Sequence, residues 1–391
     1  MSANAPRHSV AVLLSGREQF SPYFGGAVAR WTYEVYSLLR EQLEITVFGF
    51  PTPRKDLYLL PHESSRLWQV CAVLSKIPRA RRYEETLWLR ALIGRLANFR
   101  IVHIQNRPQW VATLRTLGYR GAIVLHLHND HLGHWASPQL DELAGKLDAV
   151  AVCSDYLRRT FASRSLALDA KTRVVFNAAN LKIFFPREEI RQPKTIFFVG
   201  RFDAEKGVLQ LLKAYELVLR THPDAKLVIA GATNFGTHRE TAYVQQVKEL
   251  ARRLIQSQGA HILFTEYLDH DKELPVWFQK ATIFVCPSLF QEPFGLVNAE
   301  AMACATAVVA SRRGGIPEVI GDAGRLVDPE NVEEFAAAIS ELLANPPERK
   351  RLALAGYERC RQLFDWHVTA ENWMALIDRV VEREPPAIPR D

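Results

Sequence analysis

Short apolar runs alternate with stretches of helical periodicity along almost the whole chain, and this alternation limits the possible folds more than any other feature. The runs predict strands at 10–14, 45–50, 101–105, 122–127, 149–153 and 173–176, and again at 195–199, 226–230, 261–264, 283–286, 307–310 and 324–327. Strands that alternate with helices form parallel sheets covered on both faces. Because the pattern occurs twice, we expect an α/β protein with two doubly wound, Rossmann-like domains that face each other across a cleft.

The alternation is interrupted between Phe185 and Pro193, where two prolines flank a cluster of charged residues. Such a segment is typical of a linker. The predicted domains are therefore residues 1–185 and 186–365, each long enough to bury a core of its own. A further amphipathic helix at about 366–383 is expected to pack back on the first domain.

The composition narrows the class of protein. The chain contains no apolar run of about 18 residues, the length that a membrane-spanning helix needs. Its first residues, MSANAPRHSVAVLL, lack the basic stretch and long apolar core of a secretory signal. The five cysteines are scattered without CxxC or zinc-site spacing. Reduced, buried thiols fit this distribution, so we expect a cytoplasmic protein.

The charge is unevenly distributed. Residues 1–185 carry 24 Lys and Arg against 14 Asp and Glu, a formal charge of +10, whereas residues 186–391 carry 25 against 29, a charge of −4. A basic first half favours an acidic partner, and no nucleic-acid-binding module is present. We therefore expect a phosphate-bearing acceptor or peripheral contact with an anionic membrane, here the inner face of the cell membrane. A merely basic surface is the alternative.

Basic and apolar residues recur at helical spacing over residues 76–100 of this first half. A helix of this composition could lie on an anionic bilayer. Amphipathic helices also pack on sheets with a charged outer face, and the pattern by itself does not separate the two interpretations.

The second half opens with a strand followed by the loop GRFDAEKG at 200–207, which leads into a helix. Arg201 offers a planar fork for phosphate oxygens, and Lys206 places a point charge near a helix N-terminus. Together these cations could neutralise a diphosphate. Two solvated cations beside a turn would look the same in the sequence.

The segment QEPFGLVNAE at 291–300 follows the apolar strand 283–286. Pro293 and Gly295 predict a loop before a helix, with Glu292 at the mouth of the helix and Glu300 further in. Eight residues at helical rise span about 12 Å, near the length of a sugar-diphosphate-ribose unit. The two carboxylates could accept hydrogen bonds from sugar and ribose hydroxyls, with the positive helix end between them. A capping Glu and a surface Glu remain the alternative on spacing alone.

Two glycine pairs could bring the backbone close to a ligand. Gly314 and Gly315, within GGIPE at 314–318, follow the strand 307–310. Gly25 and Gly26 follow the first strand and precede a helix. Backbone N–H groups in such turns bind anions. The chain has neither the GxGxxG dinucleotide fingerprint nor the GxxxxGK phosphate loop.

Four histidines lie close together in LHLHNDHLGH at 125–134. A zinc site would need further ligands at suitable spacing, and the sequence supplies none nearby. We predict no metal site. His128 is predicted to contact substrate from the carboxyl end of its strand, while His131 and His134 are interpreted as exposed loop residues.

In combination these motifs match a known family. GRFDAEKG, Glu292 with Glu300, and GGIPE resemble, in order and spacing, the second domain of family-four retaining glycosyltransferases with the GT-B fold. Gly25, Gly26, His128 and Ser154 add features of the first domain. The segments HIQNRPQW at 103–110 and GATNFG at 231–236 are similar to the branch that includes spore-coat-associated glycosyltransferases.

The resemblance implies roles for individual residues. Glu292 would hold hydroxyls of the donor sugar, and Glu300 the ribose. Arg201 and Lys206 would stabilise the departing diphosphate. His128 would line the acceptor side near the anomeric carbon, and residues 265–269 would lie beside the base. The implied donor-binding set is Gly25, Gly26, Arg201, Lys206, Glu292, Phe294, Gly295, Leu296, Val297, Glu300, Gly314 and Gly315.

The implied activity is retaining transfer of a hexose from a UDP- or GDP-linked donor to a glycan, lipid-linked or small-molecule acceptor, in bacterial cell-surface polysaccharide or glycoconjugate synthesis. Cationic side chains and helix dipoles would replace a metal ion, so no cofactor is expected besides the nucleotide-diphosphate sugar as co-substrate. A GT-B nucleotide-sugar epimerase, a phosphorylase and a non-catalytic assembly protein are the alternatives.

The chain departs from the family pattern in two places. NAAN at 177–180 stands where Asn-Gly-Val-Asp is usual, and Glu266 stands where a glycine is usual. Both departures leave the donor base and sugar open.

Overall fold

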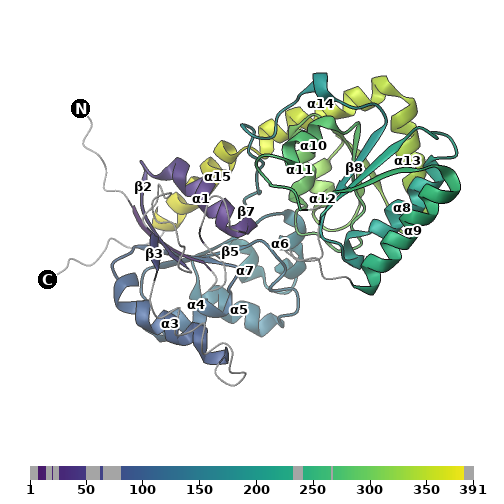
Figure 1. Cartoon of the computed structure of the whole chain (residues 1–391). Coiled ribbons are helices and arrows are strands. Elements are labelled where there is room, and N and C mark those ends of the chain that lie inside the picture. Colours follow the sequence, from purple (N-terminus) through teal and green to yellow (C-terminus); the bar gives the residue numbers. More distant parts are fainter. Residues whose placement is uncertain are drawn as a thin grey trace, which may run out of the picture. The chain divides into compact units, whose positions relative to one another are not determined.

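The computed structural model describes residues 8–14, 20, 26–49, 62–64, 81–231, 241–265 and 267–382, with the backbone alone at 62–64 and 81–84. The chain divides into two compact units (Figure 1). Unit 1 comprises Met1–Asn177 and Trp366–Asp391, and unit 2 comprises Ala178–Asp365.

Unit 1 is built on a seven-stranded sheet in the order β3-β2-β1-β4-β5-β6-β7, and every pairing in it is parallel. The strands are β1 His8–Leu13, β2 Leu43–Gly49, β3 His62–Ser64, β4 Ile101–Gln105, β5 Ala122–Leu127, β6 Ala149–Val152 and β7 Thr172–Val174. β4, β5 and β6 are buried at every residue, which explains why they appear in the sequence as continuous apolar runs rather than alternating ones.

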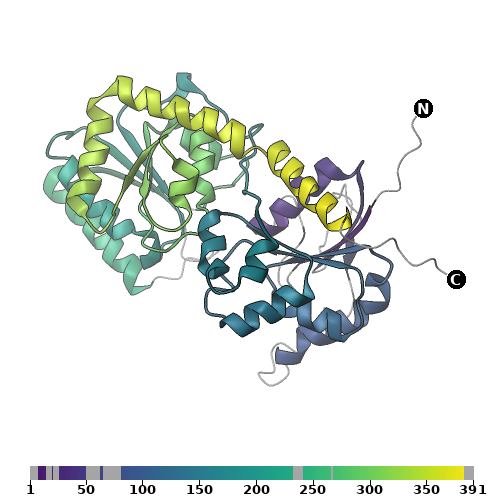
Figure 2. The same ribbon diagram turned by 180° about the vertical axis from the view of Figure 1, so that it is seen from behind.

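Helices cover both faces of this sheet. α1 Ala27–Leu39 and α15 Trp366–Glu382 lie side by side on one face, and α3 Arg81–Leu96, α4 Gln109–Thr116 and α5 Ser137–Lys146 lie on the other (Figures 1 and 2). Trp31 of α1 and Trp373 of α15 meet with ring centroids 5.1 Å apart, and both rings are buried. The last helix of the chain therefore completes the core of unit 1.

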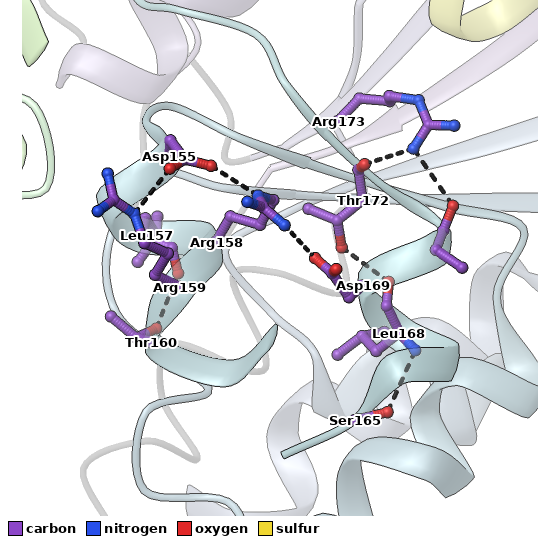
Figure 3. A network of polar contacts seen from close by, with 11 residues as sticks. Asp155, Leu157, Arg158, Arg159, Thr160, Ser165, Leu168, Asp169, Thr172 and Arg173 are labelled. Atoms are coloured by element: carbon purple, nitrogen blue, oxygen red, sulfur yellow. Dashed lines mark hydrogen bonds and ion pairs between the residues drawn. The ribbon is translucent and has the colours of Figure 1, made fainter. Parts of the chain in front are cut away.

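Two short helices, α6 Asp155–Ala162 and α7 Leu166–Ala170, precede β7 and are fixed by polar contacts (Figure 3). Arg158 of α6 bonds Asp155 at 2.6 Å and Asp169 of α7 at 2.7 Å. Each helix begins at a serine whose hydroxyl accepts a backbone N–H, Ser154 for α6 and Ser165 for α7. Serine capping of this kind explains why helices begin at these two positions.

Unit 2 has a six-stranded parallel sheet in the order β10-β9-β8-β11-β12-β13. Its strands are β8 Thr195–Val199, β9 Lys226–Ala230, β10 His261–Thr265, β11 Ile283–Cys286, β12 Ala307–Ser311 and β13 Arg325–Val327. Its α-helices are α8 Val208–Val218, α9 Ala242–Gln258, α10 Leu274–Lys280, α11 Leu296–Ala303, α12 Ile316–Ile320, α13 Val332–Ala344 and α14 Pro346–Leu363. Short 3₁₀ turns occur at η2 Glu188–Ile190 and η3 Ala204–Lys206.

The two faces of this sheet are filled differently. α8, α9 and α13 bury a mainly aliphatic core that includes Leu211, Leu254 and Ile339. On the α10 side the core is aromatic, since Phe278 packs against Phe284 of β11 with ring centroids 5.1 Å apart. The predicted α/β class with two parallel, doubly wound sheets is confirmed.

The division between the units falls eight residues before the predicted one, at 177 rather than 185. The intervening residues are tied to unit 2, because Ala179 N–H donates to Phe364 at 2.9 Å and Gln279 donates to the carbonyl of Phe185 at 2.9 Å. The buried ring of Phe184 packs near Phe278 as well. The proline-rich segment 185–193 therefore lies after the boundary between the units, within unit 2.

Candidate functional site

The motifs of unit 2 gather at one edge of its sheet. All strands are parallel, so the loops after β8, β10, β11 and β12 leave from the same edge. The strand order runs outward in both directions from the neighbours β8 and β11, which makes the point between them a topological switch. Ligands of doubly wound sheets bind at such a point. The loop 200–207 follows β8 and the loop 287–295 follows β11, so the two charged motifs meet there.

Lys206 and Glu292 join these two loops. The Lys206 ammonium forms an ion pair with Oε1 of Glu292, and the two side chains are 21% and 14% exposed. The Ser288 hydroxyl, which is buried, donates to the same Oε1 at 3.1 Å. The backbone also connects the loops, since Leu289 N–H donates to the Glu205 carbonyl at 2.7 Å. The predicted cation and the predicted carboxylate are therefore preassembled, while Ser288 was not predicted.

Arg201 lies in the same loop but is held less firmly. Its guanidinium lies 3.3 Å from Asp203 and 4.0 Å from Glu205, and its side chain is 53% exposed. Asp203 also accepts the backbone N–H of Lys206 at 3.2 Å. Arg201 is thus a solvent-accessible cation beside a fixed one, an arrangement that suits recruitment of a phosphate from solution.

The amides of the glycine pair after β12 are engaged with the Glu292 loop. Gly314 N–H donates to Oε1 of Gln291 at 2.7 Å, and Gly315 N–H donates to the Glu292 carbonyl at 2.7 Å. Gly314 has φ of +63°, and a Cβ there would lie 2.2 Å from the carbonyl oxygen of Glu292. The pair therefore supports the Glu292 backbone directly. Any contact of Gly314 or Gly315 with a donor is additional to this role.

We predict that Gly314→Ala lowers turnover while unit 2 stays folded. The left-handed conformation costs a residue with a Cβ about 1–2 kcal/mol, and the added methyl must also displace the Glu292 backbone. We expect kcat to fall at least about fivefold, the equivalent of about 1 kcal/mol in the barrier. The measurement is steady-state kinetics together with a melting curve.

Gly259→Ala is the matched control, since Gly259 has φ of +64° but nothing within 4 Å of an added Cβ. It should lose similar stability and keep its turnover. Equal kinetic losses in the two variants would show that backbone strain, rather than displacement of Glu292, is responsible.

The segment 294–300 begins α11. Gly295, with φ of +81°, is the residue before the helix, and Glu300 is nearly enclosed, its side chain only 3% exposed. Leu296 and Val297 are half-buried, whereas Phe294 is buried against the ring of Phe364 at 5.5 Å. A donor contact at Phe294 would therefore involve its backbone. The burial of Glu300 removes the interpretation of this residue as a surface Glu.

Glu300 has a partner that the sequence did not reveal. His270, in the loop after β10, places Nε2 at 2.8 Å from Oε1 of Glu300. Thr265 ends β10 in the stretch predicted to lie beside the base, and Glu266 lies outside the described residues.

In unit 1 the glycine pair is described only in part. Gly26 is extended, with φ of −68°, and immediately precedes α1. Gly25 lies outside the described residues.

His128 follows β5 and is more enclosed than a cleft-edge residue, at 8% exposed. Its Nε2 lies 3.0 Å from Oε1 of Gln105, whose amide nitrogen donates to the Thr32 hydroxyl at 3.1 Å. Thr32 in turn donates to the carbonyl of Val28 at 2.9 Å. Because the Thr32 hydroxyl donates to Val28, it accepts from the amide nitrogen of Gln105. The Gln105 oxygen therefore faces His128 and must accept, so Nε2 of His128 carries the ring proton.

The other contacts of His128 complete its positioning. Its backbone N–H donates to Oδ1 of Asn106 at 2.7 Å, and Asn106 has the unusual φ of +54°. Nδ1 lies 3.2 Å from Oδ1 of Asn177. Since an amide oxygen only accepts, the ring with its proton on Nε2 accepts from Asn177 only when that amide is turned so that its NH₂ faces Nδ1. Burial lowers the pKa of His128 to about 4, so the ring is neutral at pH 7. Gln105 and Asn106 belong to the HIQNRPQW motif, which now has a structural role.

His103 and His126 form a buried cluster with the aromatic rings of α1 and α15. His103 lies 4.3 Å from Trp373 and His126 lies 4.4 Å from Trp31, measured between ring centroids. Neither nitrogen of His126 has a hydrogen-bond partner among the described residues. Burial therefore holds the pKa of His103 and of His126 well below the usual value. His131 is half-buried, which corrects the expectation that it is exposed, and His134 is exposed.

The cluster predicts that unit 1 loses stability on acidification. A neutral buried histidine binds fewer protons in the folded state than in the unfolded state. The free energy of unfolding therefore has its full value above about pH 6.5 and decreases below that pH. Each such histidine contributes a slope of about 1.4 kcal/mol per pH unit. We expect the melting temperature to fall between pH 7.5 and 5.5, by more than carboxylate titration explains.

His126→Phe is the variant that tests the cause. Phenylalanine keeps the ring packing and removes two unpaired polar atoms, a change that is neutral or stabilising. The variant should fold at neutral pH and lose less stability on acidification. Parallel decline of wild type and variant would show that His126 does not contribute.

Among the described residues, no group of three His, Cys, Asp or Glu side chains could hold a metal ion.

The helix α3 carries the basic and apolar residues that could lie on a membrane. Its apolar residues Trp88, Leu89 and Leu92 are buried, and Trp88 packs against Trp110 with ring centroids 5.2 Å apart. Leu87 remains 44% exposed beside the exposed Arg90. This helix thus serves the core with most of its apolar surface.

No helix in the described part of the chain is both long and apolar enough to cross a bilayer.

Comparison with sequence families gives a match over the second unit. Residues 180–359 match the profile of the family described as "Glycosyl transferases group 1". The chain is 30% identical to "Spore coat protein SA" of Bacillus subtilis (strain 168), across 91% of this chain and 95% of that protein. It is 29% identical to "Alpha-maltose-1-phosphate synthase" of Mycolicibacterium smegmatis, across 94% of this chain and 99% of that protein.

Solved structures share the fold over both units. Sucrose-phosphate synthase from Thermosynechococcus elongatus superimposes with a TM-score of 0.72 and 22% identity, across 97% of this chain and 100% of that one. Alr3699/HepE of Anabaena, solved in complex with UDP-glucose, gives a TM-score of 0.70 and 18% identity, across 96% of this chain and 99% of that one.

Proposed function

The chain belongs to the glycosyl transferases group 1 family, and from this premise we propose that it transfers a hexose from a UDP- or GDP-linked donor to an acceptor with retention of anomeric configuration. The observation that carries the proposal is the ion pair between Lys206 and Glu292 at the switch point of the second sheet. A cation next to a carboxylate supports roles in stabilising the leaving group and in binding the sugar.

The proposed roles divide along the donor. Glu292 accepts hydrogen bonds from hydroxyls of the donor sugar, and Glu300 accepts them from the ribose. Lys206 and Arg201 stabilise the diphosphate as negative charge develops on it. This division is supported by their exposure, since the largely enclosed Glu292 and the buried Glu300 suit fixed recognition and the exposed Arg201 suits capture of a mobile phosphate.

In unit 1 we propose that Gly25 and Gly26 contribute backbone contacts to the donor and that His128 lines the acceptor side. A neutral His128 with its proton on Nε2 is held by Gln105 and adds no positive charge on the acceptor side. Same-face attack would let a leaving phosphate oxygen take the acceptor proton, which needs no separate protein base.

We propose that the reaction proceeds without a metal ion. The support is positive: Arg201 and Lys206 supply the charge that a divalent cation would otherwise place on the diphosphate. Activity should persist in excess chelator. Loss of activity that returns only with added Mg²⁺ or Mn²⁺ would contradict this part of the proposal.

Donor and acceptor classes are narrower proposals. Alr3699/HepE was solved with UDP-glucose, which favours testing UDP donors first. The excess of 24 Lys and Arg over 14 Asp and Glu in residues 1–185 favours an acceptor that carries phosphate, such as a lipid-linked one at the inner face of the membrane. The four described cysteines are free thiols, which fits a reducing cytoplasm. Cell-surface polysaccharide or glycoconjugate synthesis is the setting that these properties suit.

The test combines binding and turnover. A melting-temperature panel of UDP, GDP and their sugars should show stabilisation by one base, because a ligand of the folded state stabilises by RT ln(1 + [L]/Kd). The stabilising nucleotide sugar is then incubated with candidate acceptors, and the anomeric configuration of the product is read by NMR. An epimerase would alter the donor without an acceptor, and a phosphorylase would need free phosphate. The melting temperature of an assembly protein would be raised by none of these nucleotides or nucleotide sugars.

A further inference from the structure

A histidine outside every predicted motif contacts the buried carboxylate of α11. His270 places Nε2 at 2.8 Å from Oε1 of Glu300 and Nδ1 at 2.8 Å from Oδ1 of Asp271. The Glu300 side chain is 3% exposed, and that of His270 is 32% exposed. One imidazole therefore lies between two carboxylates, one enclosed and one nearer to solvent.

The turn that carries His270 is held by its own side chains. Asp269 accepts the backbone N–H groups of Asp271 and Lys272, each at 3.0 Å, and Glu273 accepts that of Asp269 at 2.8 Å. The buried ring of Phe184 meets the imidazole edge-on at 5.2 Å. His270 is thus fixed both by the turn that presents it and by a ring beside it.

The contacts determine how many protons His270, Glu300 and Asp271 hold between them. An ionised carboxylate oxygen only accepts hydrogen bonds, so an imidazole between two of them must donate from both nitrogens. The trio therefore contains an imidazolium, or a proton shared with one carboxyl group. A positive partner is also what a carboxylate as enclosed as Glu300 requires, because an unpaired buried charge is costly.

The other ionisable groups near Glu300 in the described part of the chain are otherwise engaged or neutral. The Arg191 guanidinium donates to the carbonyls of Cys304 and Ala305 and pairs with Glu188. Burial, reinforced by the Glu300 carboxylate, raises the pKa of the Cys304 thiol well above its usual value. Burial also raises the pKa of Cys360 to about 12. Both thiols stay neutral at physiological pH, and in the turn itself Asp269 and Glu273 are occupied by backbone groups while Lys272 is exposed.

We propose that His270 is a positioning residue for the nucleotide end of the donor: its imidazolium pairs with the Glu300 carboxylate and orients it to accept the ribose hydroxyls. This inference rests on the proposed function, in which Glu300 binds the ribose. It predicts that nucleotide affinity depends on the His270 proton, and that the bond-breaking step, distant from the ribose, does not.

The experiment measures binding of UDP and GDP by calorimetry from about pH 5 to about pH 9, which covers the range in which a histidine proton is lost. For whichever nucleotide binds, the wild-type Kd should rise about tenfold as His270 deprotonates, since a charge-assisted hydrogen bond contributes roughly that much. His270→Gln, which donates one neutral hydrogen bond, should bind about tenfold more weakly at the acid end and show no such pH dependence. His270→Phe, which keeps the ring against Phe184, should behave likewise.

His261→Gln is the matched control, because His261 is exposed at the start of β10 and should leave the wild-type profile unchanged. With a sugar donor, His270→Gln should raise KM and change kcat less than about twofold. Tight, pH-independent binding by wild type, or a wild-type profile in both His270 variants, overturns the inference and leaves the proposed function intact. A wild-type protein that binds neither nucleotide overturns both.

Discussion

Lys206→Met is expected to lower kcat by about a hundredfold, the equivalent of about 2.7 kcal/mol in the barrier. The lysine ammonium is fixed against Glu292 by an ion pair between two largely enclosed side chains. Removing it takes a positive charge from the proposed leaving group and leaves Glu292 without its cation, and both effects raise the barrier. Methionine preserves the length of the apolar stem, so packing should change little. Steady-state kinetics with the donor varied provide the measurement.

Arg201→Ala is the comparison that gives this result its meaning. Arg201 is 53% exposed, and its ion pairs within the described residues are with Asp203 and Glu205 of its own loop, so its loss should lower kcat/KM by about tenfold. Lys206→Arg should recover part of the activity, because it restores charge without the same geometry. If Arg201→Ala were the more damaging variant, the exposed cation rather than the paired one would be the main phosphate ligand.

The sequence was most informative about the fold where strands are buried on both faces. β4, β8 and β11 begin and end where the apolar runs do, because a fully buried parallel strand shows no alternation to misread. Helices such as α10 and α14 were not predicted. Charged and polar residues are frequent in α14, and the helix packs on α11 through a few buried residues, among them Leu352 and Cys360. Tertiary contacts rather than periodicity define such a helix.

The same distinction applies to the site. Glu292 and Lys206 could be predicted because each belongs to a motif with a characteristic local spacing. Ser288, Gln105 and His270 could not, since their importance comes from contacts with residues that lie elsewhere in the sequence. His270 contacts Glu300 across 30 positions of the chain. The glycine pair shows a related limit, because its amides support the Glu292 loop in addition to any role with a ligand.

Glu292, in the loop before α11, and Glu300, within α11, should fail in different ways when each is changed to glutamine. Glu292 is paired with Lys206 at the switch point, where charge develops during the reaction in our proposal. Glu300 is enclosed beside His270 at the proposed ribose end. A contact that is equally strong in the ground and transition states affects KM, whereas one that strengthens in the transition state affects kcat. Glu292→Gln should therefore lower kcat by at least about tenfold, about 1.4 kcal/mol, and Glu300→Gln should mainly raise the donor KM.

Glutamine keeps the shape of each side chain, and the local contacts indicate that both variants fold. In Glu292→Gln the amide can still accept from Ser288 and turn its NH₂ away from Lys206. In Glu300→Gln the amide oxygen can still accept from His270, which is then free to become neutral. The Glu300 variant should therefore also lose the pH dependence of nucleotide binding that the wild type shows. Identical kinetic patterns in the two variants, or the reverse assignment of KM and kcat effects, would mean that the donor lies along this helix in the opposite direction.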